Sequence, residues 1–173
     1  GLGDVYKRQE LCFVDQRTFG YWLYAPWDKI AHIGIDPLEP DFDSAATARR
    51  LRAKRTAVKT ALLDQTLTSG IGNIYADESL WDAQISPRKK ASTLRQKDAV
   101  ALLAAAQEVM TAALKVGGTS FDSLYVNVNG ESGYFSRSLA AYGRAGQPCL
   151  RCETPLERCI ISGRSTHFCP HCQ

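Results

Sequence analysis

The chain has 173 residues, of which 45% are hydrophobic and 23% are charged, and its formal net charge is +3. This composition is typical of a globular protein and excludes the disordered and fibrous classes. No apolar run approaches the roughly 20 residues needed to span a bilayer, so we expect no membrane role. The length suits one ordinary domain or two small ones.

The N-terminal part divides into a leader, a β-rich stretch and a linker. Residues 1–9, GLGDVYKRQ, share no periodicity with the residues after them, and we read them as a foreign leader ahead of a chain that begins inside a domain. Residues 10–26 are rich in aromatic and β-branched side chains, which predicts two strands or a hairpin. Pro37 and Pro40 then mark a linker.

A basic helix is predicted after the linker. Asp43 can cap its start, and six of the eleven residues from Arg49 to Lys59 are basic while none is acidic. A second basic cluster follows at residues 88–90. Basic patches on a nearly neutral chain indicate a polyanionic partner, and a solvated helix face is the alternative for each of them.

Two further helical segments are predicted. Residues 56–84 have a helical pattern that is interrupted at residues 69–73, and residues 94–116 form the clearest helix, which Gly117 and Gly118 stop. The apolar residues of the latter recur at three- and four-residue steps and are predicted to face the core: Leu102, Leu103, Ala106, Val109, Met110, Ala113 and Leu114. The polar stretch of about twenty residues after this helix is expected to be a functional or mobile loop.

Four cysteines form the strongest pattern in the sequence, C-x2-C-x16-C-x2-C: Cys149, Cys152, Cys169 and Cys172. Zinc prefers four soft ligands in a tetrahedron, and a two-residue spacer lets both thiolates of a tight turn face one ion. A disulfide framework suits secreted chains and a redox pair needs a βαβ unit, and the sequence indicates neither. We therefore predict one structural zinc ion in a closed site. Cys12 and Cys159 have no partner motif and are read as buried thiols.

Two residues at predicted turns are suited to binding an anion. Arg164 lies at the tip of the hairpin between the cysteine pairs, and its planar fork matches phosphate oxygens. Asn73 closes a glycine-containing turn before a new helix, where free backbone N–H groups can hold a phosphate. The local patterns leave two alternatives open, a solvated turn arginine and an asparagine that only caps the helix.

Three stretches together resemble the bacterial formamidopyrimidine-DNA glycosylases: DQRTFG, LLDQTLTSGIGNIYADESLW, and YGRAGQPCLRC with GRSTHFCPHCQ. The resemblance covers residues 10–173 and corresponds to the C-terminal two-thirds of that family. It implies an α+β fold with remnant β-strands of an N-terminal β-sandwich. The implied domains are the end of the sandwich with its linker (10–42), a helix–two-turn–helix DNA-binding domain with a lesion-covering loop (43–140) and a zinc-ribbon β-hairpin (141–173).

The resemblance also implies roles for individual residues. Arg164 matches the arginine that grips phosphates around the flipped nucleotide and assists strand cleavage, so it is the candidate catalytic residue. Asn73 and Tyr142 match residues that contact backbone phosphates. Lys54 best matches a basic residue that contacts DNA.

A wedge in the base stack is implied by the motif DQRTFG. Arg17 and Phe19 match the pair that fills the gap left by the extruded base, although the family usually has Pro-Arg-Arg-Phe where this chain has Gln-Arg-Thr-Phe at residues 16–19. Residues 119–134 match the loop that covers the damaged base. Extruding a base requires a few kcal/mol, so a wedge and several phosphate anchors make physical sense together.

The implied function is that of a DNA repair glycosylase and AP lyase, which removes oxidised purines (8-oxoguanine and formamidopyrimidines) and cleaves the strand by β,δ-elimination. Its partner is double-stranded DNA with oxidised bases or abasic sites, and the family implies a monomer associated with the bacterial nucleoid in the cytoplasm. The family's nucleophile is an N-terminal proline amine followed by glutamate, whereas this chain opens with GLGDVYKRQ, so we expect it to be inactive alone. The alternatives are an endonuclease VIII-type enzyme for oxidised pyrimidines and a non-enzymatic zinc-ribbon adaptor that binds nucleic acid.

Overall fold

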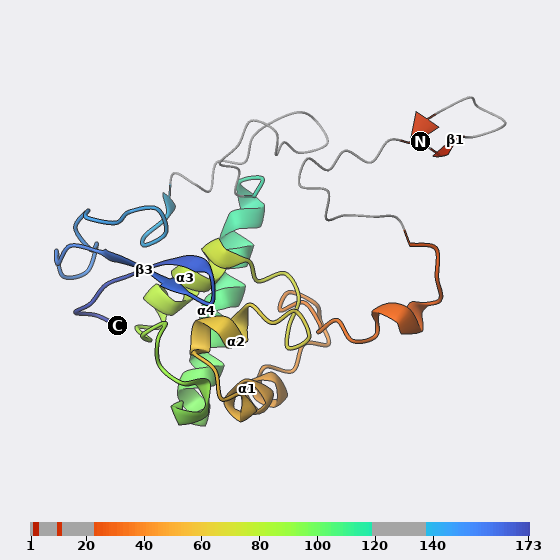
Figure 1. Cartoon of the computed structure of the whole chain (residues 1–173), viewed down its shortest axis with the longest axis horizontal. Coiled ribbons are helices and arrows are strands. Elements are labelled where there is room, and N and C mark those ends of the chain that lie inside the picture. The colour runs from red at the N-terminus through yellow and green to blue at the C-terminus, as the bar shows by residue number, and fades with distance from the viewer. Residues whose placement is uncertain (1, 4–9, 12–22, 119–137) are drawn as a thin grey trace. The chain divides into compact units, whose positions relative to one another are not determined.

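The computed structural model describes residues 2–3, 10–11, 23–118 and 138–173 (Figure 1). The chain divides into two units, Gly1–His32 and Ile33–Gln173, and each is described by itself. Among the described residues, no helix is long and apolar enough to cross a membrane.

The described residues of the first unit contain two short strands and one short helix. β1 (Leu2–Gly3) pairs antiparallel with β2 (Glu10–Leu11), and η1 is a 3-10 helix over Trp27–Ile30. Most of the stretch predicted to form strands falls in residues 12–22, which lie outside the described residues. Tyr24 and Trp27 are exposed.

The second unit begins with a helical part. Its helices are α1 (Ser44–Ala53), α2 (Val58–Leu62), α3 (Asn73–Asp82), η2 (Ala91–Thr93) and α4 (Gln96–Lys115). The start of α1 is as predicted, because Asp43 Oδ1 accepts a hydrogen bond of 2.9 Å from the Ala46 N–H. The stretch predicted to be helical over residues 56–84 forms two helices, α2 and α3, with a turn region between them.

The hydrophobic core of this unit lies where the helices meet, because α4 packs against both α1 and α3. The predicted core face of α4 is confirmed at its buried members: Leu102, Leu103, Ala106, Met110 and Ala113. The prediction is wrong for Leu114, which is 68% exposed. Leu114 lies in the last turn of α4, where the neighbouring Ala113 packs against Leu139 instead.

The chain ends in a β-hairpin, as predicted. β3 (Glu157–Ile161) pairs antiparallel with β4 (Arg164–Phe168), and Ile161 lies opposite Arg164. The two residues between the strands, Ser162 and Gly163, have φ angles of 48° and 75°. Such a two-residue turn matches the right-handed twist of the strands, and glycine adopts it without strain. β4 packs against α3, which brings the hairpin onto the helical part (Figure 1).

Candidate zinc site and nucleic-acid interface

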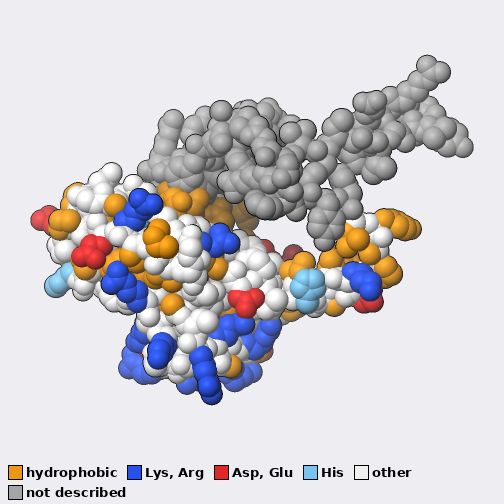
Figure 2. All heavy atoms as spheres, viewed as in Figure 1, with side chains coloured by type: hydrophobic (Ala, Val, Ile, Leu, Met, Phe, Trp, Pro, Cys, Tyr) orange, Lys and Arg blue, Asp and Glu red, His pale blue; other side chains and the backbone are white. Residues whose placement is uncertain are grey.

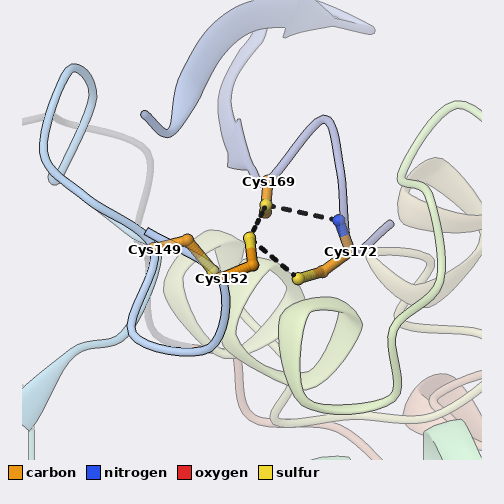
Figure 3. Close-up of side chains that lie close together, drawn as sticks. All are labelled: Cys149, Cys152, Cys169 and Cys172. Carbon is orange, nitrogen blue, oxygen red and sulfur yellow. Dashed lines mark hydrogen bonds between the residues drawn. The ribbon is translucent and has the colours of Figure 1, made fainter. Parts of the chain in front are cut away.

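The four predicted zinc ligands come together at the open end of the hairpin (Figure 3). The sulfur atoms of Cys149, Cys152, Cys169 and Cys172 all lie within 4.8 Å of one another. The Cys152 sulfur is 3.5 Å from that of Cys169 and 3.3 Å from that of Cys172. Zn–S bonds of about 2.3 Å in a tetrahedron require sulfurs about 3.8 Å apart, so this cluster fits one zinc ion.

The surroundings of the cysteines favour bound metal. Burial raises the pKa of the Cys149 thiol, but the Arg151 N–H and the Trp81 indole N–H (3.4 Å from the sulfur) donate to it and bring its pKa to about 6. Hydrogen bonding with the Cys152 sulfur raises the pKa of Cys172 to about 12. Four adjacent thiols therefore do not all ionise by themselves, and a divalent cation relieves the repulsion between the thiolates.

Both cysteine turns are bonded to residues at the end of α3 or just after it. The Arg151 guanidinium stacks 3.8 Å from the centre of the Trp81 ring, donates to the Trp81 carbonyl and forms a 2.9 Å ion pair with Asp82. In the second turn, Gln173 accepts a hydrogen bond of 2.8 Å from the Cys169 N–H and donates one of 3.1 Å to the Ile85 carbonyl. The zinc site is thus part of the packing between the hairpin and the helices.

The hairpin tip meets the start of α3. Arg164 is exposed at the first position of β4, next to the turn. Asn73 is the first residue of α3, and its Nδ2 donates a hydrogen bond of 3.0 Å to the Ser165 carbonyl. Gly72 occupies the N-cap position, and no side chain caps the helix, so Asn73 is not the cap. Asn73 and Arg164, far apart in the sequence, are therefore brought to one place.

A buried lysine from the predicted basic run binds the same carbonyl group. Lys59 of α2 and Asp77 of α3 are both 0% exposed, and the Lys59 ammonium is 2.6 Å from Asp77 Oδ1. Lys59 also donates to the Ser165 carbonyl at 2.8 Å and to the Thr166 hydroxyl at 2.9 Å. The ammonium therefore has two hydrogen-bond acceptors and one counter-charge, which together offset the cost of burying it.

Asp77 completes this buried pair and joins it to β4. Its Oδ2 accepts a hydrogen bond of 2.8 Å from the His167 N–H. Burial lowers the pKa of Lys59 and raises the pKa of Asp77, and the charge of each partner opposes the shift of the other. The sequence pattern missed this pair, because a lysine in a basic run and an aspartate in a polar helix both look solvated. Val58, Ala61 and Leu62, the buried neighbours of Lys59, were the available signal.

Tyr142 lies against the hairpin as well. Its ring packs edge-on against the His167 ring, with centroids 4.9 Å apart. The Glu78 carboxylate accepts hydrogen bonds of 2.7–2.8 Å from three successive N–H groups, those of Ala140, Ala141 and Tyr142. Glu78 therefore fixes the backbone that leads Tyr142 to the hairpin, a role that the sequence did not indicate.

The basic run is only partly available to a partner. Lys54 forms a 2.5 Å ion pair with Asp64, Arg50 donates to the Thr66 carbonyl, and Arg52 donates to the Leu94 carbonyl. Other members of the two predicted patches are exposed: Arg49, Arg55, Arg88, Lys89 and Lys90. Figure 2 shows Lys and Arg side chains gathered at the lower edge of the view, over α1 and the start of α4. The structure therefore has a basic surface on its helical part.

Three of the residues predicted to contact DNA lie in the hairpin or contact it. A fourth lies elsewhere on the helical part, and the remaining two fall outside the described residues. Asn73, Tyr142 and Arg164 belong to one cluster of contacts with β4, whereas Lys54 lies at the end of α1. Arg17 and Phe19, the predicted wedge, lie outside the described residues, as does the loop predicted to cover the damaged base.

Comparison with known proteins identifies both parts of the second unit. Residues 33–124 match the model of the formamidopyrimidine-DNA glycosylase H2TH domain, and residues 146–173 match the zinc finger found in FPG and IleRS. The zinc-finger match and the four clustered cysteines together identify the site of one structural zinc ion.

Curated relatives carry one name. The chain is 69% identical over 163 residues to a formamidopyrimidine-DNA glycosylase from Corynebacterium aurimucosum, covering 94% of this chain and 58% of the relative. It is 57% identical over 170 residues to one from Streptomyces coelicolor, covering 95% of this chain and 59% of the relative. The chain thus spans less than two thirds of the length of these relatives.

Solved structures agree with the sequence matches. The MutM (Fpg) protein from Thermus thermophilus superposes with a TM-score of 0.77 at 40% identity, over 82% of this chain and 54% of that one. A Lactococcus lactis Fpg in complex with DNA containing an abasic site superposes with a TM-score of 0.78 at 37% identity, over 86% and 54%. This chain belongs to the formamidopyrimidine-DNA glycosylase family, of which it represents a C-terminal part with the H2TH domain and the zinc finger.

Proposed function

We propose that this chain supplies the DNA-binding part of a DNA glycosylase and AP lyase that removes oxidised purines, such as 8-oxoguanine and formamidopyrimidines, and cleaves the strand by β,δ-elimination. The names of its relatives support this activity. Its partner is double-stranded DNA with oxidised bases or abasic sites, as in the Lactococcus lactis complexes with Fapy-dG and abasic DNA. We further propose a monomer that works in the bacterial cytoplasm on nucleoid DNA.

One observation carries the proposal: Asn73 of α3 and the hairpin residue that follows Arg164 are joined by a 3.0 Å hydrogen bond. An amide N–H and a guanidinium are donors, and phosphate oxygens accept hydrogen bonds from both. Two such donors close together can hold two oxygens of one strand. This arrangement supports a grip on the strained backbone of an extruded nucleotide.

The remaining predicted contacts take supporting roles. Tyr142, packed against His167, is proposed to touch a phosphate beside the first two anchors, and Lys54, at the end of α1 and paired with Asp64, is proposed to touch another phosphate. Lys54 must share its charge between Asp64 and DNA, so we expect it to be the weaker anchor. Arg17 and Phe19 are proposed to fill the gap in the base stack, and Arg164 is proposed to assist strand cleavage as well as binding.

A salt titration tests the anchors. Fluorescence anisotropy follows the chain binding to a duplex with an abasic-site analogue at increasing NaCl concentrations. Arg164→Ala is expected to weaken binding and to reduce the slope of log K against log salt by about one, because it removes one cationic phosphate contact. Asn73→Ala is expected to weaken binding at every salt concentration with little change of the slope, because the amide carries no charge. Lys115→Met, which removes an exposed charge at the end of α4, is the control. An unchanged slope in Arg164→Ala, or an unchanged affinity in Asn73→Ala, would show that the anchor concerned is misassigned.

A covalent trapping assay tests what the 173-residue chain does by itself. We propose that these residues, which span 58% of the length of the Corynebacterium aurimucosum relative, do not include the family's nucleophile, so we expect no adduct with an abasic duplex in the presence of borohydride and no release of 8-oxoguanine. An adduct formed at the rate of a full-length relative contradicts this expectation. Competition between duplexes with an oxidised purine and an oxidised pyrimidine, using a chain completed at its N-terminus, separates the purine enzyme from an endonuclease VIII-type enzyme.

A further inference from the structure

We infer that Lys59 is a positioning residue for the DNA grip: its buried ammonium holds the backbone at residues 164–166, and this backbone in turn orients Asn73 and Arg164. The inference rests on the proposed function of these two residues as phosphate anchors. Lys59 is 0% exposed, so it cannot itself touch a phosphate in this structure. Its effect on DNA must therefore pass through the residues that it contacts.

The Ser165 carbonyl is the centre of this arrangement. It accepts one hydrogen bond from Lys59 at 2.8 Å and another from Asn73 Nδ2 at 3.0 Å. A carbonyl oxygen has two lone pairs, so these two donors satisfy it completely. The buried lysine and the proposed anchor on α3 therefore share one acceptor, and displacing that acceptor moves both contacts.

The shared carbonyl decides which way the Asn73 amide points. Only the NH2 end of an amide can donate to a carbonyl, so the hydrogen bond to Ser165 holds Nδ2 toward the hairpin tip. One of its hydrogens is used there, and the other is left to donate to a phosphate oxygen. Asn73 Oδ1 is buried without a hydrogen-bond partner among the described residues. An amide released from Ser165 can rotate and turn that oxygen, which a phosphate repels, toward the DNA.

A second path leads from Lys59 to Arg164. The Thr166 hydroxyl accepts the hydrogen bond of 2.9 Å from Lys59 and donates one of 3.2 Å to the Arg164 carbonyl. Asp77, which binds Lys59 through one oxygen, accepts the His167 N–H through the other. The backbone of Arg164 is thus hydrogen-bonded to Thr166, which Lys59 binds, while Arg164 itself remains exposed. The carbonyls of two successive tip residues depend on one ammonium group.

The test compares Lys59→Met with the control Lys115→Met in the same salt titration with an abasic-site duplex. Both variants lose one positive charge, but only the first loses the buried contacts. If Lys59 positions both anchors, Lys59→Met reduces the salt slope by about one, as Arg164→Ala does, and weakens binding more than Arg164→Ala does, although Lys59 touches no phosphate. Lys115→Met changes the slope by less than one. A slope in Lys59→Met equal to that of Lys115→Met overturns the inference.

Zinc content and thermal unfolding show whether Lys59→Met is folded. If it is not, a second variant still tests the inference. Thr166→Val keeps the Lys59–Asp77 pair and nearly the same volume, but it removes the hydroxyl that links Lys59 to Arg164. It is expected to reduce the slope by about one, as Arg164→Ala does. Combining Thr166→Val with Arg164→Ala should then add nothing further. Full additivity of the two changes overturns the positioning of Arg164.

A measurement without DNA separates this inference from the proposed function. The side-chain NH2 signals of Asn73 in an amide NMR spectrum, assigned by their loss in Asn73→Ala, report its hydrogen bond to Ser165. They are expected to shift in Lys59→Met and to remain in place in Lys115→Met. Signals that stay in place in both variants overturn the inference whatever the DNA result is. A chain with shifted signals in Lys59→Met but no DNA affinity in its wild-type form refutes the proposed function and the phosphate role with it.

Discussion

The two ends of the hairpin are held in different ways. At the open end, four sulfur atoms within 4.8 Å of one another fit a metal ion, whereas at the tip a buried lysine and an asparagine bind the backbone of β4. The first attachment combines a metal site with the contacts of Arg151 and Gln173, and the second depends on side chains of α2 and α3. We therefore expect the metal to stabilise the fold of the hairpin, and the helices to determine where its tip lies.

Removing zinc should have the largest effect, because the binding free energy of structural zinc is on the order of 10 kcal/mol and becomes folding free energy. A chelator is expected to unfold residues 149–172 and to abolish most of the DNA affinity. Amide NMR signals of β3 and β4 together with anisotropy check this outcome, and added zinc should restore both. Hairpin signals that persist without zinc would show that the tip contacts suffice.

The substitution Asp77→Asn removes the buried ion pair that supports the hairpin tip. It leaves the Lys59 ammonium buried without its counter-charge, and removing one partner of a buried ion pair destabilises a protein by about 3–5 kcal/mol. Urea unfolding measures the loss. Asp82→Asn, at the exposed ion pair with Arg151, is the matched control and should lose less than about 1 kcal/mol. Equal losses of unfolding free energy in the two variants would mean that the buried pair of Lys59 and Asp77 contributes no more to stability than the exposed pair of Arg151 and Asp82.

Arg151→Ala weakens the open end without touching a zinc ligand. It removes the stacking on Trp81 and the contacts to Asp82, which together contribute about 1 kcal/mol at an exposed site. We expect a small decrease in the free energy of unfolding and a full zinc content, measured by urea titration and metal analysis. Loss of zinc would show that Arg151 supports the cysteine turn itself.

Lys54→Met gives the smallest effect and contrasts the surface lysine with the buried one. A hydrogen bond from Lys54 is the main reason that the pKa of Asp64 is lowered from 3.8 to about 2. The stability from this pair is present above pH 3.8 and is lost as the pH falls toward about 2. Without Lys54, the pKa of Asp64 should rise toward its usual value, which a carboxyl NMR titration measures, and the acid dependence of stability in this range should flatten.

The sequence predicted features that depend on local spacing. The cysteine pattern identified the zinc site, and the periodicity over residues 94–116 located α4, found at Gln96–Lys115. The periodicity wrongly placed Leu114 in the core, because a sequence pattern does not show at which turn a helix loses contact with its neighbours. These cases share one property: the information lies within a few turns of the chain.

The tip contacts could not be predicted in this way. Lys59 belongs to a basic run for which the sequence predicts either a polyanionic partner or solvent, although its partners Ser165 and Thr166 stand more than a hundred positions later. Asp77 and Glu78 are adjacent on α3 and both buried, which no amphipathic pattern suggests. Their charges are stabilised by backbone N–H groups of distant segments. Only the folded chain shows that these acids face partners rather than water.

Glu78 has a consequence for how this family can change over time. Its carboxylate accepts hydrogen bonds from the N–H groups of Ala140, Ala141 and Tyr142, so one side chain of α3 attaches three successive residues of the backbone that leads to the zinc finger. A buried N–H group that loses its acceptor destabilises the folded state. A single substitution of Glu78 by a residue without a carboxylate would leave these three N–H groups without this acceptor at once, so we expect position 78 to keep an acidic side chain.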